Sequence, residues 1–282
     1  MELKPSVPSR ESQFLNSYSS ALILTRLPDL SNSLARTEIS SSARSQLVNW
    51  LFEASSKLIP TDAHSCELVF TRTIHLMDLY FKKAPSPPLR EDVLHLLGVT
   101  CLFVSMKAES VEIGTLTDFC AKTTRGAFTS LQVQEQEFKL VAALSFYVSF
   151  TTRAEACDFL FHKVGAKLPL ELAKHIRSLA GFVLMALTYN ADFNNHGSIT
   201  LILSAILVAF KYVLNEAKAK NKPAPFDEEQ VTAKLLVDFK DNLPSICRGV
   251  KIVKKGILNF FELYKTQNTL MAFSTFEKNY FI

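Results

Sequence analysis

The chain has 282 residues, of which 48% are hydrophobic and 21% charged, so it can bury a large core and is not a disordered segment. Its 31 basic and 27 acidic residues give a net charge of +4, which is too small to predict nucleic-acid binding. It has 8 glycines, a scarcity that favours helices over a β fold rich in tight turns.

The cysteines are scattered and form no Cys-x-x-Cys motif: Cys66, Cys101, Cys120, Cys157 and Cys247. This pattern is typical of reduced thiols, so we expect an intracellular protein, in the nucleus, the cytoplasm or both. The N-terminal sequence MELKPSVPSRES has no apolar core, so we expect no secretion signal. The longest apolar stretch, residues 199–210, is interrupted by Thr200 and Ser204 and predicts a buried helix rather than a membrane span.

Apolar spacing and capping residues predict a short N-terminal helix and five further helices in the first half of the chain. Pro28 ends the first helix, Thr61 or Asp62 can cap the third, and Thr129 with Gln132 can form a capping box for the last. The predicted helices span residues 11–25, 41–58, 62–82, 89–107, 113–122 and 130–144.

The helix predicted over residues 89–107 has apolar side chains in every direction between residues 94 and 106. A helix that is apolar all round is surrounded by other helices, so we expect it at the centre of a bundle. Gly98, in its middle, would allow a neighbouring helix to approach closely.

The second half repeats this arrangement around the apolar segment 199–211. Aligning Lys211 with Lys107 superimposes LSAILVAFK on VTCLFVSMK, and further helices are predicted at residues 153–164, 170–189, 228–237 and 243–264. This repetition predicts an all-α fold with two consecutive five-helix bundles, each around a central apolar helix. We therefore divide the chain into an N-terminal extension with a short helix at 1–35, a first bundle at 36–150, and a second at 151–282 that includes a C-terminal tail.

The sequence predicts no catalytic centre, because no GxGxxG, P-loop, HExxH or GxSxG motif occurs. The histidines are isolated, so no metal site is predicted, and His95 is expected to be a hydrogen-bonded residue near the surface. The acids Asp227, Glu228 and Glu229 fit the first turn of a helix. We therefore expect a protein that is not an enzyme and needs no cofactor.

Four blocks follow one another in the order and spacing of the cyclin box: RSQLVNWLFE, LHLLGVTCLFVSMKAES, DFC and QEQEFKLVAALSFYVSFTT. The chain resembles a two-box cyclin, closest to the mitotic A and B types. The resemblance covers residues 11–152 well and the second half more loosely. The tail ELYKTQNTLMAFSTFEK is similar to the close of B-type cyclins. The resemblance implies an all-helical regulator that binds and activates a cyclin-dependent kinase.

The resemblance implies a kinase-binding surface around a buried lysine–glutamate pair, which falls on Lys107 and Glu137. In the family this pair grips the backbone preceding the kinase's mobile helix, each charge offsetting the other. Ala108 stands where many cyclins carry an aromatic residue. The other implied contacts are Val104, Val141, Phe146 and Val148 around the pair, and Leu15 and Tyr18 in the N-terminal helix.

The resemblance also implies a groove that binds Arg-x-Leu motifs of substrates or inhibitors. Its positions fall on Ala43, Gln46, Leu47, Trp50, Glu53 and His95. Leu47, Trp50 and Glu53 match the family, whereas Ala43 and Gln46 replace larger apolar residues and His95 replaces a glutamine. Because an apolar pocket that loses its floor binds leucine less well, we expect this groove to be weak.

The sequence thus predicts a cyclin that binds a serine/threonine kinase and controls the cell cycle and mitosis, with no membrane or nucleic-acid partner. A cyclin-fold transcription factor related to factor IIB is one alternative, but the zinc ribbon and strongly basic face of such proteins are missing. A local basic patch could still form from Lys218, Lys220, Lys222, Arg248, Lys251, Lys254 and Lys255, although a solvated face fits these residues better. The other alternative is a cyclin-like scaffold that has lost kinase activation.

Overall fold

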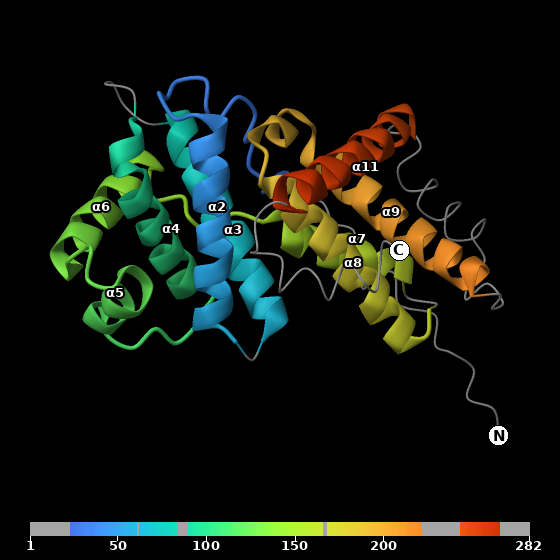
Figure 1. The fold of residues 1–282 in the computed structure, drawn as a ribbon, viewed down its shortest axis with the longest axis horizontal. Coiled ribbons are helices and arrows are strands. Elements are labelled where there is room, and N and C mark those ends of the chain that lie inside the picture. The colour runs from blue at the N-terminus through green and yellow to red at the C-terminus, as the bar shows by residue number, and fades with distance from the viewer. Residues whose placement is uncertain (1–22, 61, 84–88, 166–167, 221–242, 266–282) are drawn as a thin grey trace, which may run out of the picture.

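The computed structural model describes residues 23–60, 62–83, 89–165, 168–220 and 243–265, and every regular element in these ranges is a helix (Figure 1). The predicted all-α class is therefore confirmed. The elements are α2 (Ser41–Leu58), α3 (Ala63–Lys83), η1 (Glu91–Val93), α4 (Leu94–Ala108), α5 (Leu116–Thr124), α6 (Ser130–Ala143), α7 (Arg153–Gly165), α8 (Leu170–Thr188), η2 (Ala191–Asn195), α9 (Ser198–Ala219) and α11 (Leu243–Lys265).

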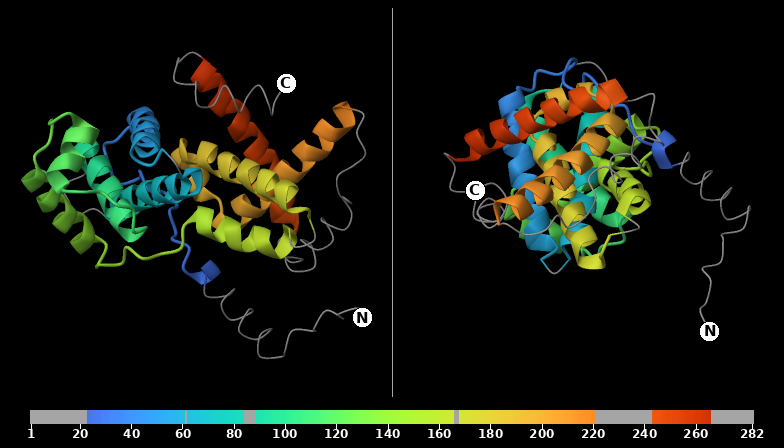
Figure 2. Two further views of the ribbon diagram at one scale, coloured as in Figure 1. Left: turned by 90° about the horizontal axis from the view of Figure 1, so that it is seen from below. Right: turned by 90° about the vertical axis from the view of Figure 1, so that its right-hand side faces the viewer.

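The helices form two groups that lie side by side (Figures 1 and 2). In the first group α2, α3, α5 and α6 pack around α4, and in the second group α7, α8 and α11 pack around α9. Each predicted apolar helix is thus at the centre of its group. The helix predicted over residues 228–237, and most of the one predicted over 11–25, lie outside the described residues.

Helix α4 is surrounded as its composition predicts, because residues 97–106 are all buried. A Cβ atom on Gly98 would lie 2.9 Å from Cδ1 of Leu47, so the missing side chain is what allows α2 to pack directly on the backbone of α4. A larger residue at this position would require the Leu47 side chain to shift.

Helix α3 is buried more completely than its apolar pattern indicates, since residues 69–81 are all buried. It packs on α2 and α4 of the first group and also on α7 and α8 of the second. The polar residues Arg72, His75 and Asp78 on α3 are therefore enclosed between the two groups. The central helices α4 and α9 are thus not the only deeply buried ones in the described part of the chain.

Several helix ends confirm the predicted caps, and two differ from the prediction. Asp62 accepts backbone hydrogen bonds at the start of α3, and Thr129 forms the expected capping box of α6. Helix α5 begins at Leu116, later than predicted, because Thr115 and Asp118 form a capping box there. The segment before α4 is the short η1, where the Glu91 carboxylate instead accepts hydrogen bonds from the N-cap of α2.

Helix α9 extends to Ala219, beyond the predicted end, because Val213 and Leu214 continue its buried face. With a mean hydropathy of 1.8 over its most apolar window, it is the one helix among the described residues that is long and apolar enough to cross a membrane. However, 61% of that window is buried against the rest of the fold. The helix therefore fits the predicted role as the core of the second group.

Candidate functional site

The structure brings Lys107 and Glu137 together on the surface of the first group. Lys107 lies in the last turn of α4, and its ammonium donates a hydrogen bond to the carboxylate of Glu137 on α6. The ammonium is also 4.4 Å from the centre of the Phe103 ring, which favours a cation. The side chains are 45% and 23% exposed, so the pair is accessible, and the ammonium has further protons to donate to a partner.

The apolar residues expected around this pair differ in their exposure. Ala108 and Phe146 are exposed, and Val141 and Val148 are half-buried. Val104 is 4% exposed, so it is buried in the core of the first group. Leu15 and Tyr18, the other residues implied by the resemblance, lie outside the described residues.

Phe146 follows α6 in a tight turn that presents its ring to solvent. Its φ is 61°, a left-handed conformation that is uncommon for a bulky side chain, and Ser145 before it has a φ of 52°. The turn is held by the Phe146 amide, which donates to the carbonyl of Val141 at 2.8 Å, and by the Val148 amide, which donates to the carbonyl of Phe146 at 3.1 Å. The ring is nevertheless 71% exposed. Strained backbone of this kind is typical of functional surfaces.

Arg72 on α3 fixes the segment that follows this turn. Its guanidinium donates to the carbonyl of Phe150 at 2.9 Å and bonds Glu109 after α4 at 2.5 Å and Glu155 on α7 at 3.1 Å. Arg72 is 5% exposed, so these bonds replace its contacts with water. The sequence alone does not single out Arg72, because its partners lie far away along the chain.

The residues of the predicted groove also lie together, on α2 and at the start of α4. Leu47 is buried, Ala43, Trp50 and Glu53 are half-buried, and Gln46 is exposed. The His95 ring is edge-on to Trp50, with centroids 4.6 Å apart. His95 is exposed, but partial desolvation of its ring lowers its pKa, because desolvation disfavours the charged imidazolium.

Two features of the groove were not predicted from the sequence. Phe128 packs on the other side of His95, with centroids 5.2 Å apart, so the imidazole is held between two aromatic rings. The Glu53 carboxylate accepts a hydrogen bond from the Asn49 amide at 3.3 Å and lies 3.9 Å from the Lys57 ammonium. The groove therefore satisfies much of its own polar and aromatic surface.

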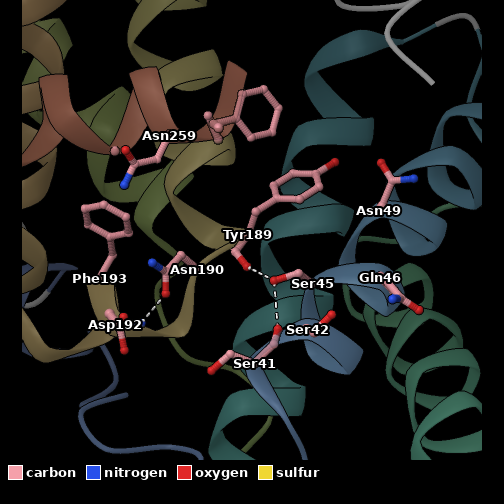
Figure 3. Close-up of a pocket in the computed structure, with 13 residues that line it drawn as sticks. Ser41, Ser42, Ser45, Gln46, Asn49, Tyr189, Asn190, Asp192, Phe193 and Asn259 are labelled. Atoms are coloured by element: carbon pink, nitrogen blue, oxygen red, sulfur yellow. Dashed lines mark hydrogen bonds between the residues drawn. The ribbon is translucent and has the colours of Figure 1, made fainter. Parts of the chain in front are cut away.

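Gln46 also lines a cavity of about 440 Å³ between α2 and the second group (Figure 3). The α2 side of the cavity carries hydroxyl and amide side chains, and the opposite wall comes from the end of α8, from η2 and from α11. The Ser45 hydroxyl spans the two walls with a 2.7 Å hydrogen bond to the carbonyl of Tyr189. The outer face of α2 is thus polar toward the second group, which explains why an amide stands at position 46.

Arg44, between these α2 residues, points inward and joins the two groups. It forms a bidentate ion pair with Asp78, with hydrogen bonds of 2.8 and 2.7 Å, and each side chain is 1% exposed. The guanidinium also donates to the carbonyl of Thr188 at 2.8 Å, and the Asn194 amide donates to Asp78 at 2.8 Å. This network fixes α2 and α3 against the second group.

The lysines of the candidate basic patch that the structure describes are all exposed on α9, α11 or the residue after α9, and Arg248 is exposed as well. Lys220 pairs with Glu216 at 2.6 Å. This fits a solvated charged face, and Lys222 lies outside the described residues. Within the described ranges no three histidine, cysteine or acidic side chains are placed to hold a metal ion.

Comparison with known proteins identifies the family to which the first group of helices is similar. The family description "Cyclin, N-terminal domain" matches residues 15–149, which include α2 to α6 and the Lys107–Glu137 pair. This part of the chain is a cyclin N-terminal domain. The chain is 26% identical to the G2/mitotic-specific cyclin-B1 of Oryzias latipes over 65% of this chain and 42% of that protein, and 28% identical to Cyclin-A2-1 of Arabidopsis thaliana over 41% of this chain and 24% of that protein.

These relatives are cyclins of the B and A types, as the sequence indicated. The matched region is less than half of either relative's length. Among solved structures the fold is similar to a viral cyclin from herpesvirus saimiri, with a TM-score of 0.66 and 17% identity over 89% of this chain and 98% of that one. A chain in the CAK complex of Chaetomium thermophilum, bound to ATP-γ-S, aligns over 95% of this chain and 81% of that one, with a TM-score of 0.54 and 13% identity.

Proposed function

We propose that this protein is a cyclin, a regulatory subunit that binds and activates a cyclin-dependent serine/threonine kinase and controls cell division, acting in the nucleus, the cytoplasm or both. The observation that carries the proposal is the Lys107–Glu137 pair, half-exposed among apolar side chains in the part of the chain that matches the cyclin N-terminal domain. A lysine donates to backbone carbonyls and a glutamate accepts from backbone amides, so the pair can grip a segment of main chain whatever its sequence.

The proposed mechanism is differential binding and involves no chemistry by the cyclin itself. A partner that binds only one conformation of a kinase shifts the population toward that conformation. Here the favoured conformation would be the one in which the regulatory helix is swung in and the catalytic lysine–glutamate pair of the kinase is formed. The exposed Phe146 and the half-buried Val141 and Val148 supply apolar area beside the charged grip.

The test is a titration of each purified cyclin-dependent kinase from the source organism with the wild-type protein and with Lys107→Ala and Glu137→Ala. Each substitution should cost about 2–5 kcal/mol of binding, because it leaves the other charge without its partner in a dry interface. The matched controls are Lys251→Ala and Glu171→Ala, which remove exposed charges from α11 and α8 of the second group and should leave affinity unchanged.

Two further measurements complete the test. Circular dichroism should show unchanged helicity in all four variants, since each altered residue lies at the surface. A kinase assay on the complex separates activation from binding. Affinity that is unchanged in both Lys107→Ala and Glu137→Ala would refute the interface, and tight binding without kinase activity would favour a cyclin-like scaffold instead.

A further inference from the structure

Large apolar side chains that are exposed to solvent gather on one part of the described fold. Seven such residues are exposed, and four of them lie on α6 or directly after it: Leu131, Phe138, Phe146 and Tyr147. Single exposed apolar residues are ordinary, but several on one helix and the turn after it favour a surface that another molecule covers.

Phe138, like Leu131 and Tyr147, is not part of the surface that the sequence predicted, and of these three it is the one next along the chain to a member of the Lys107–Glu137 pair. It is 70% exposed, and Leu131, two helical turns before it on the same stripe of α6, is 63% exposed. Phe138 directly follows Glu137 on α6, so it lies about 100° farther round the helix than the glutamate that pairs with Lys107, on the more exposed side. Its exposure means that the core does not depend on this ring.

We propose that Phe138 is the aromatic anchor of the kinase-binding surface and takes the place of the aromatic residue that many cyclins carry at the position of Ala108. The inference rests on the proposed function, and it concerns a residue that the argument for that function does not use. Ala108 directly follows Lys107 on α4, as Phe138 follows Glu137 on α6, so each position is next along its helix to one member of the same ion pair. In this chain the aromatic contact would come from the outer face of α6, and not from the end of α4 as in many cyclins.

The occupant of this surface is the kinase, which would present an apolar pocket opposite α6 next to the backbone held by the ion pair. The surface around Phe138 combines one ring with mixed charges, because Glu135 and Lys139 flank it and are exposed. A buried ring with a polar rim is the usual composition of a binding hot spot. A kinase that lacks this pocket would lose the contact, so Phe138 would help to select the partner.

The test is a thermodynamic cycle with Phe138→Ala, Ala108→Phe and the double variant, titrated against the kinase that binds the wild-type protein. Phe138→Ala should weaken binding by about tenfold to a hundredfold, the usual loss for a central aromatic residue. Adding Ala108→Phe to it should restore about tenfold or more, because an aromatic ring then returns to the same surface. A purely structural role for Phe138 would not be rescued from α4.

The matched control is Leu258→Ala, which removes a side chain that is 64% exposed on α11 of the second group and should not change affinity. Phe138→Gln, with circular dichroism on all variants, provides a second substitution that keeps α6 polar and folded. A loss with both substitutions at position 138 and a rescue by Ala108→Phe support the anchor.

The outcomes separate the anchor from the proposed function. If Lys107→Ala abolishes binding but both substitutions of Phe138 leave it unchanged, the anchor is refuted and the kinase interface stands. If neither position matters, or no kinase binds the wild-type protein, the interface is refuted and the anchor with it. If sedimentation shows a wild-type dimer that Phe138→Ala dissociates, the ring belongs to a contact between two copies, which also overturns the inference.

Discussion

The two predicted surfaces of the first group have opposite characters. On α4 and α6 the expected charged pair is half-exposed, and the rings of Phe138 and Phe146 project into solvent. On α2 the groove residues interact with one another, with His95 against Trp50 and the Glu53 carboxylate accepting from Asn49. A surface that leaves apolar rings uncovered is suited to a partner, whereas one that satisfies its own groups has less to gain from binding.

The difference originates in single residues and not in the fold. Both surfaces are built on the same central helix, with Lys107 at its end and His95 at its start. Gly98, between them, allows Leu47 to pack on the helix backbone, so the groove has the expected framework. What the groove lacks is apolar bulk at positions 43 and 46, and this can be restored without changing the other surface.

The largest expected effect concerns the support that both surfaces share, the ion pair between Arg44 and Asp78. Arg44→Ala should lower the free energy of unfolding by about 3–5 kcal/mol, because it leaves a buried carboxylate without its partner. Urea unfolding measures this loss, and Arg36→Ala, which removes an exposed arginine, is the matched control. A loss below about 1 kcal/mol would show that water reaches this junction.

The next effect separates the two surfaces directly, by removing one glutamate from each. Glu137→Ala should weaken kinase binding by about 2–5 kcal/mol, since Lys107 then enters the interface unpaired. Glu53→Ala, on the groove, should leave kinase affinity unchanged. Titration of one kinase with both variants measures the two affinities. Equal losses of affinity would mean that the kinase covers α2 as well as α6.

A smaller effect concerns the groove itself. An Arg-x-Leu peptide should bind the wild-type protein weakly, and Ala43→Met with Gln46→Ile should strengthen the binding by roughly 1–3 kcal/mol, or about tenfold to a hundredfold, by restoring apolar area. Fluorescence anisotropy with a labelled peptide measures both affinities. Adding Trp50→Ala to the repaired groove should remove the gain. Tight binding by the wild-type protein, lost in Trp50→Ala without loss of fold, would show that the groove is already functional.

The sequence predicts the helices and the pairing of Lys107 with Glu137, because both depend on local spacing or on the cyclin-box pattern. For Val104 the apolar pattern predicts the core and the cyclin-box pattern predicts the surface, and the sequence does not decide between them; nor does it predict that Phe128 packs on His95. These depend on which side of a helix its neighbours cover, and an all-apolar helix such as α4 gives no sign of that.

The burial of α3 shows the same limit on a larger scale. Arg72, His75 and Asp78 interrupt its apolar pattern and would ordinarily mark an exposed face. They are buried because the second group packs there, and Arg72 and Asp78 are satisfied by residues far away in the chain, Glu155 and Asn194. A pattern read along one helix cannot contain that information, whereas the structure shows it at once.

The smallest expected effect concerns the junction between the two groups. The pH dependence of stability tests this junction separately from both surfaces. His75 on α3 is fully enclosed, and neither ring nitrogen has a hydrogen-bond partner among the described residues. Burial holds its pKa well below the ordinary value of 6.5, and the positive charges of Arg153, Arg72 and Arg44 lower the pKa further. The native protein therefore keeps His75 neutral in a pH range where the unfolded chain binds a proton.

Because the unfolded state binds more protons below pH 6.5, the free energy of unfolding should fall as the pH drops below that value. The loss attributable to His75 should approach about 1.4 kcal/mol for each pH unit, until the pH reaches the lowered pKa of the native state. Urea unfolding between neutral and mildly acidic pH measures the slope, which should become shallower in His75→Asn but not in His162→Asn, an exposed histidine on α7. If the slope is the same in His75→Asn as in the wild-type protein, a proton reaches His75 in the folded state and the junction between the two groups is open to solvent.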